Sequence, residues 1–208
     1  MTTPIGGSAL PVVLAITGAS GGPYAVRLLD ALIAAGRPVW LMVSSHGWRL
    51  LHTECELDTM EALRARIGAE RWDEHVTVYD TSDRGARPAS GSARWAGMIV
   101  CPCSMGTLSA IAAGSSRSLV ERAGDVALKE RRPLVLVPRE TPLSAIHLEN
   151  MLRLTRAGAV VLPAMPGFYH RPRAIGDLVD FVVARVLDHV GVEHRLGHRW
   201  GDSPADDA

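Results

Sequence analysis

Apolar runs of strand length alternate with helical segments along most of this chain, and each run ends in a polar or glycine-rich loop. The runs lie at 12–17, 39–43, 98–101, 134–137 and 160–162, and each is long enough only for a buried strand. Parallel strands need a crossover connection, which is usually a helix. The alternation therefore predicts an α/β fold with a doubly wound parallel sheet.

Helical periodicity fills the intervals between these runs. Apolar residues recur at helical spacing from Ala25 to Ile33 and stop at Gly36. Ser118 and Glu121 fit a capping box that opens another helix. The remaining helices are expected over 47–54, 59–67, 105–113, 144–157 and 175–190, with a polar loop at 82–91.

The chain has 208 residues, of which 47% are hydrophobic, and this suits a single core. We expect one domain over residues 10–201, with flexible tails at 1–9 and 202–208. No repeat, low-complexity run or linker interrupts this span.

Composition argues against several classes of partner. Lys plus Arg and Asp plus Glu both number 22, and only 5% of residues are aromatic, so nucleic acid is not an expected partner. The three cysteines make an odd count, which favours reduced thiols over disulfides. No secretory n-region and no apolar stretch of bilayer length is present, so a cytoplasmic protein without a membrane partner is expected.

The loops after the expected strands carry the candidate chemistry. They are rich in glycine and hydroxyl residues at 17–22, 44–45 and 101–107, and they include Arg139-Glu140 and residues 162–167. Open parallel sheets bind ligands beyond the carboxyl ends of their strands. Small residues, hydroxyls and an Arg-Glu pair at that edge indicate a phosphate-bearing cofactor.

Most of these motifs also have a plain structural interpretation. The turn from Gly18 to Gly22 lacks the spacing of a dinucleotide fingerprint or a Walker loop, and it is either a phosphate-binding turn or an ordinary βα turn. Ser104 is a candidate helix cap. Cys101 and Cys103 are too few and too close for a zinc site, so packing is favoured over a catalytic thiol.

Charged and aromatic residues later in the chain present similar choices. Arg139-Glu140 either faces the ligand crevice, which we favour, or forms a surface ion pair. Tyr169 and Arg185 suit phosphate binding, although Arg185 also fits a solvated helix face. The cations Lys129, Arg131 and Arg132 precede a strand, at the opposite sheet edge. Within one subunit they fit a solvated helix C-terminus, and they would reach a ligand only in a neighbouring subunit. His194 and His198 lie in a Gly-bearing tail, and no metal site is predicted.

Taken together, the motifs resemble those of UbiX-type flavin prenyltransferases. The resemblance spans about residues 12–201, and its most specific part is the stretch from Ala127 to Pro142. The segments that carry it are Gly18-Ala19-Ser20-Gly21, Ser44, Pro88–Ser92, Cys101–Ser104, Ala127–Leu136, Arg139–Pro142 and Gly167–His170.

The resemblance implies a flavodoxin-like Rossmann fold of three layers that binds reduced FMN. It implies transfer of a dimethylallyl group from dimethylallyl monophosphate to N5 and C6 of the flavin. The product would serve a UbiD-type decarboxylase. Homododecamers with sites between subunits are expected.

The resemblance also assigns roles to residues. The implied catalytic residues are Glu140, Ser20, Glu54 and Lys129. The implied FMN-binding residues are Gly18, Ala19, Ser20, Gly21, Ser44, Ser104, Met105, Gly106, Thr107 and Arg139. The implied substrate-phosphate ligands are Tyr169, Arg185, Lys129, Arg122, Glu140, Ser90 and Gly91. This chain has Arg84 where some relatives carry an aromatic residue, and Trp200 matches a C-terminal aromatic.

Two other functions remain open at this stage. FMN-dependent cysteine decarboxylases are expected to share the fold, but their carboxylate-binding Asn corresponds to Gly106 here. A non-catalytic flavin-binding module is the second alternative, and the combination of Glu140, Lys129, Tyr169 and Arg185 argues against it.

Overall fold

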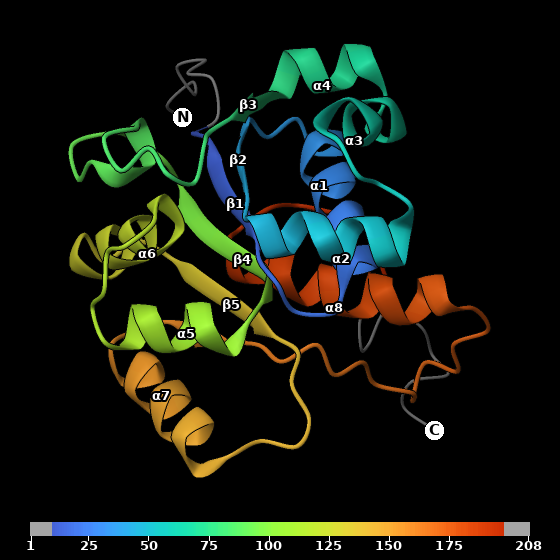
Figure 1. The fold of residues 1–208 in the computed structure, drawn as a ribbon. Helices are drawn as coiled ribbons and strands as arrows, with labels where there is room; N and C mark the ends of the chain where they lie inside the picture. Colours follow the sequence, from blue (N-terminus) through green and yellow to red (C-terminus); the bar gives the residue numbers. More distant parts are fainter. Residues whose placement is uncertain (1–9, 198–208) are drawn as a thin grey trace, which may run out of the picture.

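A computed structural model describes residues 10–197 (Figure 1). The expected tails at 1–9 and 202–208 lie outside this range, and so do His198 and Trp200. Six parallel strands form one sheet in the order β3-β2-β1-β4-β5-β6. They are β1 (Val12–Ile16), β2 (Val39–Val43), β3 (Val76–Val78), β4 (Gly97–Cys103), β5 (Leu134–Pro138) and β6 (Val160–Val161).

The five expected strands are confirmed and lie in the flavodoxin order, with β2 and β4 on either side of β1. The sixth strand, β3, was not predicted and extends the edge beyond β2. Val78 is 41% exposed. A three-residue strand with this exposure has no apolar run to indicate it. The strand order reverses between β1 and β4, which is where ligands bind in such sheets.

Eight α-helices connect and cover the strands in the described part of the chain. Their bounds are α1 (Gly22–Ala34), α2 (Ser45–Cys55), α3 (Met60–Ile67), α4 (Ala69–His75), α5 (Met105–Ala112), α6 (Leu119–Lys129), α7 (Ala145–Arg156) and α8 (Ile175–His189). A 3₁₀ turn, η1 (Arg87–Ala89), lies inside the expected loop at 82–91. Helix α4 was not predicted.

Alternate side chains along each buried strand pack into two separate hydrophobic cores, one on each face of the sheet. Val12, Leu14 and Ile16 of β1 pack toward α1 and α8, whereas Val13 and Ala15 pack toward α5 and α6. Figure 1 shows α1, α2 and α8 on one face of the sheet and α5, α6 and α7 on the other. The molecule therefore has the three layers expected of a doubly wound fold.

One predicted cap differs in detail. The Ser118 hydroxyl accepts a hydrogen bond from the Glu121 N–H at 3.2 Å, as expected. The Glu121 carboxylate, however, accepts from the Arg117 N–H at 2.8 Å and pairs with the Arg117 guanidinium. The predicted capping box is therefore incomplete, because Glu121 binds the residue before the cap.

Candidate active site

The loops after β1 and β4 are joined by a buried hydroxyl. Thr17, which is 2% exposed, donates from Oγ1 to the Pro102 carbonyl and accepts from the Ser104 N–H, each at 2.9 Å. These two hydrogen bonds lie between β1 and β4, where the strand order reverses. The sequence prediction gives Thr17 no role, and its only signal was a hydroxyl at the end of an apolar run.

Two further contacts bring the loops after β2 and β5 to the same place. A Cβ on Gly18 would lie 2.4 Å from the Cβ of His46, so the start of α2 packs directly against the β1–α1 turn. The Arg139 Nε–H donates to the Ser20 carbonyl at 3.3 Å. Ser20, Ser104 and Arg139, which are far apart in sequence, therefore lie along one rim of the sheet, next to the Ser44 cap of α2.

Glu54 is a residue of α2, and its carboxylate lies at the amino-terminal end of α1. Its Oε2 accepts hydrogen bonds from the Gly21 N–H at 2.8 Å and the Gly22 N–H at 2.7 Å. Burial alone would raise the pKa of this carboxyl. Bonds from Gly21, from the Ser20 hydroxyl and from Gly22, with the charge of Arg139, outweigh burial and lower the pKa. These two N–H groups are thus not free to cradle a phosphate, which favours the ordinary βα turn of the two alternatives for residues 18–22.

The start of α5 is a second helix amino terminus at this edge of the sheet, and it faces open space beside Gly106. The Ser104 Oγ accepts from the Thr107 N–H at 3.2 Å and donates to the Thr107 hydroxyl at 3.0 Å. In residues 10–197, no loop carbonyl or side chain accepts a bond from the N–H of Met105 or Gly106. A Cβ on Gly106 would meet only the Ser104 Oγ, at 4.0 Å. Uncommitted N–H groups at a helix start, beside open space, suit a phosphate.

Arg139 and Glu140 line a cavity of about 280 Å³ at the ends of β5 and β6. Its other walls are the apolar side chains of Leu143, Met151 and Met165, together with prolines 138 and 163. Glu140 accepts from the Thr141 N–H at 3.2 Å. A charged pair beside an apolar hollow can bind a ligand that has both an anionic and a hydrocarbon part.

Tyr169 belongs to a neighbouring aromatic group rather than to the rim itself. Its ring meets Phe181 of α8 edge-on, with centroids 5.8 Å apart, and 61% of the residue is exposed. Phe181 and Arg185 lie four residues apart and so share a face of α8. The Arg185 guanidinium pairs with Asp188 at 3.1 Å. The structure thus links Tyr169 to the helix that carries Arg185.

Of the remaining predicted phosphate ligands, Lys129, Ser90 and Gly91 lie at the opposite edge of the sheet, and Arg122 lies near the start of α6. Lys129 ends α6 just before β5, and Gly91 precedes β4. A Cβ on Gly91 would lie 2.8 Å from the Lys129 Nζ, so the two residues are neighbours. Ser90 shares a hydrogen bond with Ser92 at 3.0 Å, and Arg122 pairs with Asp125 at 2.6 Å.

This second group is too far away to share a ligand with the rim of its own chain. Lys129 and Arg139 flank the five-residue strand β5, and such a strand spans roughly 16 Å.

The thiols fit a packing role. Burial raises the pKa of Cys101 to about 12 and also raises that of Cys103, and both residues are buried. Few thiolates therefore form near neutral pH. Among the described residues there is no cluster of metal-ligating side chains and no helix that is long and apolar enough to cross a bilayer.

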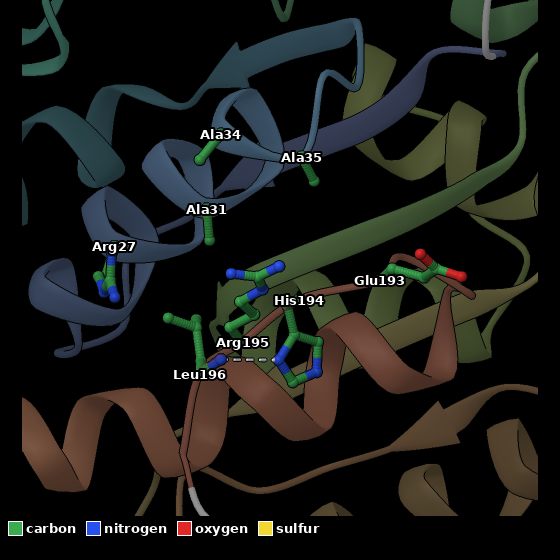
Figure 2. A pocket seen from close by; sticks show the side chains of 8 residues that line it. All are labelled: Arg27, Ala31, Ala34, Ala35, Glu193, His194, Arg195 and Leu196. Atoms are coloured by element: carbon green, nitrogen blue, oxygen red, sulfur yellow. Dashed lines mark hydrogen bonds between the residues drawn. The ribbon is translucent and has the colours of Figure 1, made fainter.

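A larger cavity, of about 580 Å³, lies away from this rim (Figure 2). It is lined by Arg27, Ala31, Ala34 and Ala35 of α1 and by residues 193–196, and it contains none of the predicted site residues. Figure 2 shows His194 bonded to the Leu196 N–H, which donates to Nδ1 at 3.1 Å. Cavity volume alone therefore does not mark the predicted site. The predicted polar groups converge at the rim of the sheet instead, beside the smaller cavity.

Comparison with known proteins finds relatives over most of the chain. Residues 7–187 match the Flavoprotein family. The flavin prenyltransferase UbiX of Pseudomonas aeruginosa is 50% identical, over 92% of this chain and 94% of that protein. The enzyme of the same name from Alkalihalophilus pseudofirmus is 49% identical, over 92% and 96%.

Solved structures extend the comparison. AnUbiX (PadA1) in complex with FMN and dimethylallyl pyrophosphate is 41% identical and superposes with a TM-score of 0.84, over 94% of this chain and 99% of that one. A dodecameric FMN-dependent UbiX-like decarboxylase from Escherichia coli O157:H7 is 43% identical, with a TM-score of 0.82, over 92% and 99%. The cysteine decarboxylase TvaF is only 18% identical, with a TM-score of 0.58, and shares the fold alone.

Proposed function

The chain belongs to the family of UbiX flavin prenyltransferases, and we propose that it joins a dimethylallyl group from dimethylallyl monophosphate to N5 and C6 of reduced FMN. The observation that carries this proposal is the convergence of Ser20, Ser104 and Arg139 on one rim, beside a cavity with apolar walls. A flavin with a phosphate tail and a short branched hydrocarbon both match that surface.

The residues at the rim fit FMN. The open N–H groups of Met105 and Gly106 would hold the phosphate tail, with the hydroxyls of Ser104 and Thr107 nearby. Arg139 would add a positive charge, since only its Nε is committed to Ser20 within residues 10–197. The small residues Gly18 to Gly21 and the Ser44 end of α2 would border the ring system.

When bound, reduced FMN supplies the nucleophilic positions of the reaction. The protein must orient the two partners and stabilise the phosphate that leaves with the electron pair of the broken C–O bond. Tyr169, Arg185, Lys129 and Arg122 would supply hydroxyl and cationic donors to that phosphate. Glu140 would give a proton to the departing phosphate, or carry the proton that is lost when the second bond forms.

A complete site requires a second copy of the chain. The rim and the Lys129 group lie at opposite edges of one sheet, so we propose that one subunit provides the rim and a neighbour provides Lys129, Ser90 and Gly91. The dodecameric E. coli relative supports an oligomer of this kind. As a further part of the proposal, the product serves a UbiD-type decarboxylase, and the protein acts in the cytoplasm, where the free cysteines fit a reducing environment.

An anaerobic incubation tests the proposed reaction. The protein, reduced FMN and dimethylallyl monophosphate should give a product whose mass is that of the flavin plus one dimethylallyl unit. A parallel incubation with the diphosphate tests the choice of donor, because the AnUbiX complex contains the diphosphate. Glu140→Gln should slow turnover by roughly 10²-fold or more if Glu140 transfers a proton, whereas Glu149→Gln on α7 should not.

Unmodified flavin in every incubation would contradict the proposed function. Full turnover of both bond formations by Glu140→Gln would contradict only the role of Glu140.

A further inference from the structure

Arg132 is not among the residues that the family resemblance assigns to the site, and it lies in the group of residues at the amino edge of the sheet. Its Nη2–H donates to the Gly91 carbonyl at 2.6 Å. The guanidinium also lies over the ring of Trp95, with its central carbon 4.3 Å from the ring centroid. Trp95 is 3% exposed, so the guanidinium rests on a buried aromatic face.

The loop held by Arg132 is the one that meets Lys129. A Cβ on Gly91 would lie 2.3 Å from Glu130 Oε1 and 2.8 Å from Lys129 Nζ, so the ends of both side chains pack directly against Gly91. The Lys129 ammonium and the Glu130 carboxylate also pair with each other. The Gly91 backbone is thus held by Arg132 through its carbonyl while the Lys129–Glu130 pair lies against its Cα.

The arrangement around Arg132 has a cost. Arg132 Nη1 and Trp95 Nε1 are buried, and neither has a hydrogen-bond partner within the described range. A buried donor without an acceptor destabilises the folded state. The stack on Trp95 and the bond to Gly91 favour this geometry in spite of that cost, and the burial of Nη1 keeps it from direct contact with a substrate.

Building on the proposed function, we infer that Arg132 is a positioning residue for the substrate phosphate. It fixes the loop from Ser90 to Ser92 against α6, and thereby presents Gly91 and Lys129 together to a neighbouring subunit. A phosphate bound there meets a preformed pair of donors instead of ordering a loop, and preformed donors bind more tightly than mobile ones.

Steady-state kinetics of Arg132→Gln tests the inference. We expect the KM for dimethylallyl monophosphate to rise about tenfold, while kcat at saturation, the Kd for FMN and the oligomer mass stay near those of the parent protein. Arg132→Lys, which keeps the charge and one donor, should recover part of the KM. Arg131→Gln is the matched control, because it removes the same charge from the adjacent, exposed position.

A double-mutant cycle separates this inference from the proposed function. Arg132→Gln should add little to the KM of a Lys129→Ala variant, since both changes act on one phosphate contact. An unchanged KM in Lys129→Ala would contradict the shared site of the proposed function. A raised KM in Lys129→Ala with a normal KM in Arg132→Gln would overturn only the inference about Arg132. Equal losses in substrate KM and FMN Kd would also overturn it, because they would indicate general damage.

If Arg132→Gln does not fold, Arg132→Lys and Trp95→Phe decide the same question. Each keeps part of the stack, and each should raise the KM for the monophosphate by several-fold without altering the Kd for FMN. A normal KM in both variants would overturn the inference.

Discussion

At the scale of single residues, Glu54 acts as a built-in anion for the first helix. Its carboxylate accepts the N–H bonds of Gly21 and Gly22, where α1 begins, and Arg139 adds a positive charge nearby. Its folded-state pKa is lowered, so the carboxylate adds stability that is fully present above the unfolded pKa of about 4.3. This stability is lost as the pH falls through the lower, folded-state pKa.

Glu54→Gln should therefore destabilise the protein by an amount that depends on pH. We expect a loss of about 1 kcal/mol in unfolding free energy near neutral pH, because the side chain is only partly buried and solvent screens its charge. The difference from the parent protein should shrink when the pH is brought below about 4. Urea unfolding at both pH values measures it, with the exposed Glu149→Gln as the control. A loss of the same size at both pH values would show that charge is not the cause.

At the scale of single elements, α5 and α6 begin in the same way but face different surroundings. Ser104 and Ser118 each accept a hydrogen bond from an N–H three residues later, both at 3.2 Å. Only the start of α5 lies at the rim with Thr17 and Arg139. Comparing substitutions at the two caps therefore separates an effect on helix stability from an effect on ligand binding.

Ser104→Ala and Ser118→Ala should lower stability alike but differ in FMN binding. Each loses a cap worth about 1 kcal/mol, which thermal or urea unfolding will detect. Ser104→Ala should also weaken FMN binding by several-fold, measured by flavin fluorescence, because its hydroxyl borders the proposed phosphate site. Equal FMN affinity in the two variants would remove Ser104 from that site.

The elements also show how far the sequence could predict this molecule. Strands β1, β2, β4 and β5 were predictable because each is buried on both faces, and the partly buried β6 because its two residues are both apolar. Strand β3 and helix α4 were not, since Val78 is largely exposed and α4 buries only Trp72. The rim was predictable from the strand ends. The roles of Thr17 and Arg132 were not, because both depend on contacts between segments more than 40 residues apart.

At the scale of the whole molecule, the sheet separates two groups of polar residues that the proposed reaction needs together. The rim with Arg139 lies beyond the carboxyl ends of the strands, and the group with Lys129 and Gly91 lies at the amino ends. No movement of a side chain closes the length of β5. A heterologous interface between two copies of the chain brings two different surfaces together.

Mixing two inactive variants tests whether the two groups meet between chains. Lys129→Ala keeps the rim but lacks the lysine of the amino edge, and Arg139→Ala keeps the amino edge but lacks the arginine of the rim. Each variant alone should therefore have little activity. Mixed oligomers should contain some sites in which both halves are intact. Random mixing in equal amounts predicts about a quarter of the parent activity. Mixing Arg139→Ala with the Arg139→Ala/Lys129→Ala double variant is the matched control, because no combination of those chains restores Arg139. If the first mixture were no more active than its separate components, Lys129 and Arg139 would not complete one site from two chains, and the shared site would have to be abandoned.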